Sequence, residues 1–349
     1  IPLDAPARQA GGVLRSPRAV NPKVSQTVSD AVMAGLEMDY RKRPQSVEDF
    51  LSLLEAKKKP AVTVSTPEVA LPGFEFGKKI REDFIISVYE VRKAGKSYHL
   101  ITFKPPLDWK TKKLLLEIVG KLERIDHPNL VSLIDVYQQV DNVFLIYEEV
   151  SGMSLRERFK LLAPLNPSIA VDTAIAIGEA LSALHKAGLA HGDLHPGNVV
   201  VTPGAHIKVL NAGILIPFQD YIKQGNLNFL MMRAPYAAPE IARGFPQSPQ
   251  TDIYSLGVIL FEALTGWLPF EGQDPMAIAV KQNKEPPLSP GKINPKIPRA
   301  LEGVVLKALQ KDLDKRYSTI KEVLTDLEEI KYALHYGYSL NWSPLDPKR

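Results

Sequence analysis

The chain has 349 residues, with 43 Lys and Arg against 39 Asp and Glu, so its formal net charge is only +4. Because this charge is small and dispersed, it gives no reason to expect nucleic acid or an acidic membrane surface as a partner. The sequence contains no cysteine, which excludes disulfides, thiolate catalysis and cysteine-ligated zinc. This composition fits a reducing compartment, and we expect a cytoplasmic location.

Hydropathy gives no sign of a membrane segment. The most apolar stretch, residues 253–264, is interrupted by Ser255, Gly257 and Glu262. It is also shorter than the roughly 20 residues that a spanning helix needs. We therefore expect neither a transmembrane helix nor a signal peptide.

The first 73 residues divide into three segments by pattern. Residues 1–23 contain four prolines and little periodicity, which predicts an extended leader. Residues 24–56 contain two apolar stripes of helical period on either side of an RKRP turn, which predicts a helical hairpin. Residues 57–73, with KKKP and several Thr, Ser and Pro, have the composition of a linker.

From residue 74 the pattern changes to strands and later to helices. Residues 74–150 contain alternating, β-branched and aromatic runs with one amphipathic helix, Trp109 to Ile125, among them. Residues 151–334 are mostly helical in pattern, and residues 335–349 form a short tail. Strands first and helices after predict the α+β class, with a small antiparallel sheet preceding a larger helical part.

An internal repeat links the two ends of the chain. Residues 21–54 align without gaps with residues 294–327, so that Asn21 matches Asn294, and Arg43 matches Arg316. Two amphipathic hairpins can resemble each other by chance, which is the plain alternative to a duplicated segment. A hairpin of this size is below the ~40 residues that fold unaided, so we expect it to lie against the main domain or a partner.

Four motifs occur in order along the main domain. They are HPNLVSLIDVY at residues 127–137, HGDLHPGNVVV at 191–201, YAAPE at 236–240 and DIYSLGVILFEALTG at 252–266. The second places one carboxylate, Asp193, five residues before one carboxamide, Asn198. A turn capped by Asp and Asn side chains explains such a pair by itself, although it does not explain the other three motifs.

Together these motifs resemble protein kinases of the eukaryotic type, bacterial members included, over about residues 74–334. The resemblance implies a two-lobed fold, with a small β lobe at 74–150 and a larger helical lobe at 151–334. Residues 24–56 resemble the last helices of a kinase large lobe, which implies a second, truncated kinase-like domain. Because the chain begins at Ile1 in the middle of a pattern, we expect a piece of a longer protein.

The resemblance also implies roles for particular residues. Lys104 would hold the phosphates of ATP, Asp193 would accept the proton of the substrate hydroxyl, and Asn198 would bind a metal ion. Asn211 would be a second, degenerate metal position. The implied nucleotide-binding residues are Lys104, Glu117, Tyr147, Glu148, Val150 and Val88, with Tyr147 at the back of the pocket. The implied structural residues are Asp252, which would bind the catalytic loop, and the pair Glu240 and Arg316.

The chain departs from the family where phosphates and metal would bind. The three glycines of the phosphate-covering loop fall at Arg81, Asp83 and Ile86, although that loop needs bare backbone. Asn211, Ala212 and Gly213 stand in place of Asp, Phe and Gly, so the anionic metal ligand is lost. The glutamate that should pair with Lys104 falls at Ile118, unless a one-residue insertion restores Glu117.

Three further departures affect the transferred phosphate and its control. His195 replaces a catalytic-loop lysine, Gly192 replaces an arginine, and Arg233 occupies the usual threonine slot near Asp193. Residues 214–232 contain no Ser or Thr, only Tyr221, which excludes switching by Ser/Thr phosphorylation there. Since metal stabilisation is worth several kcal/mol, we expect a rate lowered by orders of magnitude.

Three functions remain open from the sequence. The first is a pseudokinase that acts as a regulatory or scaffold module with weak or absent binding of ATP and Mg²⁺. The second is an active but atypical Ser/Thr protein kinase with Asp193 as base. The third is an architectural spacer in a longer protein. We expect a protein partner or adjoining domains of a longer chain, and no certain cofactor.

Overall fold

The structure is a computed structural model that describes residues 16–21, 24–37, 43–46, 49–50, 71–139 and 142–346. The chain forms two compact units, residues 1–70 and residues 71–349, which are described separately. Most of the predicted linker, and most of the second helix of the predicted hairpin, lie outside the described residues.

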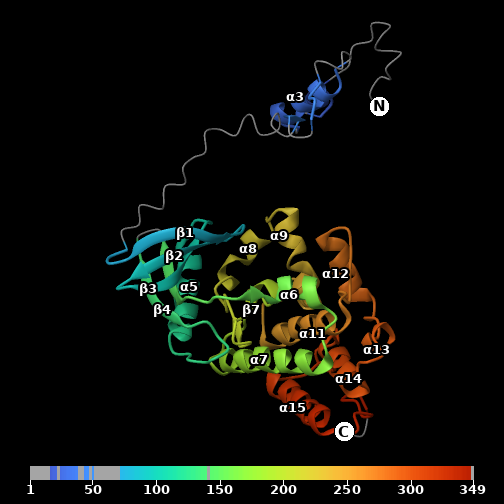
Figure 1. The fold of residues 1–349 in the computed structure, drawn as a ribbon. Helices are drawn as coiled ribbons and strands as arrows, with labels where there is room; N and C mark the ends of the chain where they lie inside the picture. Colours follow the sequence, from blue (N-terminus) through green and yellow to red (C-terminus); the bar gives the residue numbers. More distant parts are fainter. Residues whose placement is uncertain are drawn as a thin grey trace, which may run out of the picture. The chain divides into compact units, whose positions relative to one another are not determined.

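The second unit begins with a five-stranded antiparallel sheet in the order β1-β2-β3-β5-β4 (Figure 1). Its strands are β1 (Glu75–Glu82), β2 (Ile86–Lys93), β3 (Lys96–Phe103), β4 (Leu133–Gln138) and β5 (Val143–Glu148). Helix α5 (Trp109–Leu122) begins at the N-cap Asp108 and buries Leu115, Ile118, Val119 and Leu122. The β-branched and aromatic strand residues therefore form one small lobe with a single main helix.

The larger lobe follows and is mostly helical. A three-stranded sheet, β6-β7-β8, carries the loop that contains Asp193. Its strands are β6 (Met153–Ser154), β7 (Val199–Val201) and β8 (Ile207–Val209). Its longer helices are α6 (Leu155–Leu162), α7 (Pro167–Lys186), α11 (Pro249–Thr265), α12 (Pro275–Lys284), α14 (Arg299–Ala308) and α15 (Ile320–Tyr336). The predicted α+β class and two-lobed arrangement are confirmed (Figure 1).

Short helical turns complete the larger lobe. They are η2 (Pro196–Asn198), η3 (Ile216–Phe218), α8 (Gln219–Ile222), α9 (Leu227–Met231), η4 (Ala234–Tyr236), α10 (Pro239–Ala242) and α13 (Pro290–Ile293). Five of them lie between residues 214 and 242, where the chain returns from the loop of Asp193 to α11.

Among the described helices, α7 is the one that is long and apolar enough to cross a membrane. Its apolar residues, including Val171, Ile177 and Leu181, are buried within the larger lobe. At Gly178 the helix approaches α15 so closely that an added Cβ would lie 2.8 Å from Leu324. Its apolar character is thus explained by packing in the core.

Several predicted boundaries need correction. The predicted extended leader contains one helical turn, α2 (Pro17–Val20), capped by Ser16. The second unit begins at Leu71, which is buried, rather than at residue 74. Helix α15 continues to Tyr336, and the predicted tail then packs back on α14, where the Ala300 N–H donates to the Leu340 carbonyl at 3.1 Å.

The first unit contains α2 and α3 (Gln26–Gly35), and both have a counterpart 273 residues later. Helix α2 corresponds to α13, and α3 corresponds to α14, with the same first and last positions. Ser16 and Ser289 both cap the shorter helix, and Asn21 and Asn294 both end it. The sequence repeat is thus also a repeat of local structure.

Hydrogen bonds repeat at the same offset. The Arg18 N–H donates to Ser29 Oγ at 3.3 Å, and the Gly291 N–H donates to Glu302 Oε1 at 3.2 Å. Arg43 Nε donates to the Glu37 carbonyl at 2.6 Å, as Arg316 Nε does to the Gln310 carbonyl at 2.8 Å. Apolar periodicity cannot produce such matching polar contacts, so chance similarity of two hairpins is a poor account of the repeat.

The larger lobe contains a buried ion pair between Arg316 and Glu240. Arg316 Nη1 and Nη2 donate to the two carboxylate oxygens of Glu240 at 2.6 and 3.0 Å. Arg316 Nη1 also donates to the Gln250 carbonyl at 2.9 Å, and the guanidinium lies 5.1 Å from the Tyr254 ring centroid. Since both side chains are almost fully buried, neither can be removed without leaving an uncompensated charge.

We expect Arg316→Ala to lower the free energy of unfolding by about 3–5 kcal/mol, because it leaves the Glu240 carboxylate buried and unpaired. Chemical denaturation followed by circular dichroism measures this change. Lys315→Ala is the matched control, since the Lys315 side chain is 72% exposed and its loss should cost under about 0.5 kcal/mol. Equal effects of the two substitutions would contradict the assignment.

Candidate functional site

A cavity of about 1060 Å³ lies between the five-stranded sheet and the loop that carries Asp193. Val88, Ile101, Val150 and Leu210 contribute apolar walls, and Asn198, Asn211, Lys104 and Arg233 contribute polar ones. A cavity of this size exceeds what a drug-sized ligand needs. Its volume therefore does not limit nucleotide binding. The arrangement of its polar groups determines whether a nucleotide fits.

The loop of Asp193 is held in place from the core. Asp252, at the start of α11, accepts hydrogen bonds from the N–H groups of His191 at 2.8 Å and Gly192 at 3.0 Å. His185 Nε2 also lies 2.9 Å from Asp252 Oδ2. Gly192 has a φ of +74°, and a Cβ there would lie 2.7 Å from Ile216. An arginine side chain therefore has no room at this position.

Asn198 and Asn211 bond to each other in the floor of the cavity. Asn211 Nδ2 donates to Asn198 Oδ1 at 3.0 Å, and Asn198 Nδ2 donates to Asp193 Oδ2 at 3.1 Å. Asn211 has a φ of +60°, a conformation that Asn tolerates better than most residues. The amide oxygen of Asn198 is thus already engaged by an N–H group.

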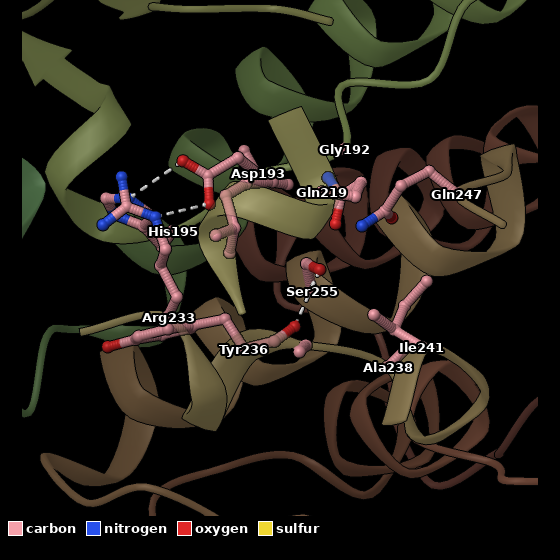
Figure 2. A pocket seen from close by; sticks show the side chains of 13 residues that line it. Gly192, Asp193, His195, Gln219, Arg233, Tyr236, Ala238, Ile241, Gln247 and Ser255 are labelled. Carbon is pink, nitrogen blue, oxygen red and sulfur yellow. Dashed lines mark hydrogen bonds and ion pairs between the residues drawn. The ribbon is translucent and has the colours of Figure 1, made fainter. Parts of the chain in front are cut away.

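Arg233 joins two carboxylates from different lobes. Its Nε donates to Asp193 Oδ1 at 3.0 Å, and its Nη2 donates to Asp83 Oδ2 at 3.1 Å. Its guanidinium also stacks on Phe229, with Cζ 3.8 Å from the ring centroid. Figure 2 shows Arg233 and Asp193 pointing toward each other beside a smaller cavity of about 90 Å³. Arg233 lines both cavities, so it stands where substrate would meet nucleotide.

The surroundings of Asp193 make it a poor proton acceptor. Burial raises the pKa of its carboxyl, but the positive charge of Arg233, together with the contact of the His195 ring, outweighs burial and holds the pKa well below its ordinary value. A general base works best with a pKa near the operating pH. With Arg233 in place, the Asp193 carboxylate is therefore stabilised as an anion rather than prepared to take a proton.

His195 does not supply the positive charge of the lysine that it replaces. Its ring is buried, and burial lowers its pKa although Asp193 lies nearby. The Gly197 N–H donates to His195 Nδ1 at 3.0 Å, so Nδ1 is the unprotonated nitrogen of a neutral ring. The other nitrogen, Nε2, lies 3.5 Å from Asp193 Oδ2.

The turn between β1 and β2 is closed by its own aspartate. Asp83 Oδ1 accepts the N–H groups of Ile85 at 2.7 Å and Ile86 at 2.9 Å. In a phosphate-binding loop such N–H groups would be free for the ligand. Arg81, at another expected glycine position, extends its guanidinium toward the Gly197 carbonyl at 3.5 Å. This turn is an ordinary capped hairpin turn.

Lys104 forms an ion pair with Glu82 of β1 instead of with a residue of α5. The hydrogen bonds from Lys104 and then Lys79 lower the pKa of Glu82 to about 2, so Glu82 stays charged. Glu117, which the sequence left open as the partner of Lys104, is exposed on α5. Ile118, the alternative position, is buried and would contact a Cβ added at Gly213.

An aromatic residue, Phe103, ends β3 directly before Lys104. Val88 pairs with Ile101, and both line the cavity, as does Lys104. The Phe103 ring stacks on Phe218, with centroids 4.9 Å apart and planes at 14°. Phe103 was not identified from the sequence, because strand parity follows from pairing that local pattern does not specify.

Of the residues in and after β5, at the back of the cavity, some line the cavity and others point away from it. Tyr147 and Val150 line the cavity, and the buried Tyr147 hydroxyl has no hydrogen-bond partner among the described residues. Burial raises the pKa of this phenol well above its ordinary value. Glu148 points away, since its Oε1 accepts from the Ser132 N–H at 2.9 Å and from Lys208 Nζ at 2.7 Å. Glu148 is accordingly not among the residues that line the cavity.

These contacts do not fit a magnesium nucleotide. Among the described residues no group of three or more His, Asp or Glu side chains lies close enough together to hold a metal ion. The Asn198 oxygen is used by Asn211, and both oxygens of Asp193 are used by Arg233 and Asn198. Mg²⁺ prefers hard oxygen ligands in near-octahedral geometry, and the side-chain oxygens of Asp193 and Asn198 already have partners within the protein.

Comparison with known proteins places this chain in a family. The family model described as the protein kinase domain matches residues 87–327. The chain therefore belongs to the protein kinase family. A structure of Rad53 residues 1–466 in complex with AMP-PNP has a similar fold, with a TM-score of 0.61 and 20% identity over 73% of this chain and 64% of that one.

Sequence relatives in the family are bacterial Ser/Thr protein kinases. A probable serine/threonine-protein kinase of Clostridium perfringens, CPE1738, is 37% identical over 60% of this chain and 30% of its own length. The PknB kinase of Lactococcus lactis is 37% identical over 59% of this chain and 33% of its own length. The PrkC kinase of Bacillus subtilis is 33% identical over 58% of this chain and 31% of its own length. The matched part of this chain thus spans about a third of the length of each of these curated relatives.

We expect Arg233→Met to raise the pKa of Asp193, because burial then acts without the opposing charge. The pKa of Asp193 is depressed in the folded state, so the stability it provides is full above about pH 4 and is lost as pH falls further. The difference in unfolding free energy between the natural chain and the variant, about 3 kcal/mol at pH 7, should therefore shrink below pH 4.

Urea denaturation between pH 2.5 and 7 and NMR titration of carboxyl carbons measure both effects. Lys223→Met is the matched control, since it removes an ion pair between side chains that are 70% and 91% exposed. A stability difference that stays constant through pH 3 would show that Arg233 does not act through Asp193.

Proposed function

We propose that this protein is a pseudokinase, a kinase-shaped regulatory or scaffold module that does not transfer phosphate from ATP. The observation that carries the proposal is Arg233, whose guanidinium binds Asp193 and Asp83 at 3.0 and 3.1 Å. This contact occupies the carboxylate that would act as base and ties the larger lobe to the turn that would cover the phosphates. A protein substrate and a triphosphate both need that space.

Other contacts within the site support the same proposal independently of Arg233. The N–H groups of Ile85 and Ile86 in the turn donate to Asp83, and Lys104 forms an ion pair with Glu82. The side-chain amides of Asn198 and Asn211 bond to each other. Each of these polar groups thus has a partner within the protein. Asp252 and the pair of Glu240 and Arg316, which hold the fold, keep their contacts. The departures from the family are therefore confined to positions that would bind ATP or take part in phosphate transfer.

The alternative is an active but atypical Ser/Thr protein kinase, and the names of the bacterial relatives favour it. Asp193, Asn198 and the wide cavity would serve such an enzyme. It requires that Arg233 leave both carboxylates and that Lys104 leave Glu82 before nucleotide binds. Breaking the buried contacts of Arg233 would cost several kcal/mol, which nucleotide binding would have to supply.

We further propose that residues 24–56 belong to the end of the larger lobe of a second kinase-like domain. The support is that α2 and α3 have the same bounds as α13 and α14 at an offset of 273, with the same Ser and Asn caps on the shorter helix. A protein built from two kinase-like domains fits a role in regulation or assembly.

We expect no incorporation of phosphate from ATP into the chain or a general protein substrate, and no rise in Tm with ATP and Mg²⁺ or Mn²⁺. Radiolabelled ATP and thermal unfolding measure the two, with Asp193→Ala as the control that lacks the base position. Phosphate incorporation that disappears in Asp193→Ala would contradict the pseudokinase proposal. A Tm raised by nucleotide without incorporation would leave a nucleotide-binding pseudokinase.

A further inference from the structure

Two arginines that line the large cavity have no acid partner. Arg81 of β1 and Arg156 of α6 both line the cavity of about 1060 Å³. Within the part of the chain that the structure describes, neither of them forms an ion pair with Asp or Glu. The other two positive side chains in the wall, Lys104 and Arg233, each bind a carboxylate. The cavity wall therefore carries positive charge that these described acids do not neutralise.

Both guanidiniums approach the same residue of the loop that carries Asp193. Arg81 Nη1 lies 3.5 Å from the Gly197 carbonyl oxygen, which is a long contact for a hydrogen bond. Arg156 Nε lies 3.4 Å from the position that a Cβ at Gly197 would take. Because residue 197 has no side chain, an arginine from each lobe can reach this stretch of backbone. The two positive charges thus lie on either side of one glycine.

Both charges are partly withdrawn from water. Burial lowers the pKa of the Arg81 guanidinium, although the nearby Asp83 carboxylate opposes this effect. Arg156 Nε is buried and has no hydrogen-bond partner among the described residues. Arg156 Nη2 donates to the Met232 carbonyl at 3.0 Å, which is an uncharged partner. A shielded charge without a counter-charge is costly, and a bound anion removes this cost.

The acids in the wall of the cavity are already engaged. Glu82 and Asp83 each form an ion pair with another cation of the wall. Glu157 caps its own helix, since it accepts from the Ser154 N–H at 2.9 Å and from Ser154 Oγ at 2.6 Å. Each of the three therefore has a partner other than the two arginines. A counter-charge for these arginines is best supplied by a ligand.

We propose that Arg81 and Arg156 form an oxyanion subsite beside Gly197, which binds the phosphate monoester or carboxylate group of a small organic molecule without a metal ion. The planar fork of a guanidinium presents paired donors to two oxygens of such a group. The volume of the cavity suits a small molecule. The subsite is not the phosphate site implied by the family, because Arg81 stands at a position where a glycine was expected.

The inference does not depend on whether the protein transfers phosphate, and it supplies a ligand class for a regulatory module. A triphosphate bound to Mg²⁺ is a poorer ligand for this subsite, because the metal ion already neutralises part of its charge.

Thermal unfolding of the full chain in the presence of EDTA tests the subsite. The probes are phenyl phosphate and benzoate, with benzyl alcohol as the uncharged counterpart, all at constant ionic strength. We expect at least one of the two anions to raise the Tm by about 3–5 °C at ten times its Kd, and benzyl alcohol to leave it unchanged. The anion that acts identifies the ligand as a phosphate or a carboxylate. No rise with either anion, or an equal rise with benzyl alcohol, overturns the proposal.

Substitutions distinguish a binding role from a structural one. Arg81→Met should raise the Tm of the ligand-free protein by about 2–4 °C, because it removes an unpaired, shielded charge, and should abolish the response to the anion. Arg156→Met should weaken anion binding at least about tenfold in Kd, which is the change expected for one charged hydrogen bond. The matched control is Arg92→Met, whose side chain is 62% exposed and bound to Glu90. It should leave the response unchanged.

A response that survives in both Arg81→Met and Arg156→Met, or one that Arg92→Met abolishes as well, overturns the assignment to these two arginines. If one of the first two variants does not fold, the other decides the outcome by itself. None of these measurements involves ATP or Mg²⁺, so phosphate transfer by the natural chain would refute the pseudokinase proposal and leave this one standing.

Discussion

The guanidinium of Arg233 is the contact on which the state of the site depends. It lies between one carboxylate of the small lobe, Asp83, and one of the larger lobe, Asp193, and all three side chains are largely shielded from water. In a shielded site each charge is costly unless it is paired, so removing any member leaves a penalty that the other two must absorb. The three charges are therefore paired with one another within the protein.

The same argument about buried charges distinguishes the family positions that this protein keeps from those at which it carries a different residue. Asp252 and the pair of Glu240 and Arg316 are buried, and each is bound from several directions, so their loss would endanger the fold itself. The glycine positions and the metal aspartate stabilise a ligand rather than the fold. Substitutions there change chemistry at little cost in stability, and this is where Asp83 and Asn211 are found.

Motif order predicted the α+β fold and the two lobes, because hydrophobic period and turn residues act locally along the chain. Motif spacing also identified the loop of Asp193, Asn198 and Asn211, whose members the structure brings within hydrogen-bond distance. The sequence placed Arg233 near Asp193 but gave no sign that Asp83 would join them. Spacing along the helix left Glu117 and Ile118 open as the position facing Lys104, because spacing does not give the direction in which a helix face points.

The amino-acid sequence by itself determined the family, the order of elements and the missing metal aspartate, since each is a property of residue types at fixed separations. Only the tertiary structure decided the partners of the polar groups. Lys104 pairs with Glu82, Phe103 stacks on Phe218, and Arg233 joins two lobes. These outcomes depend on strand register and on contacts between residues up to 150 positions apart, which local pattern leaves undetermined.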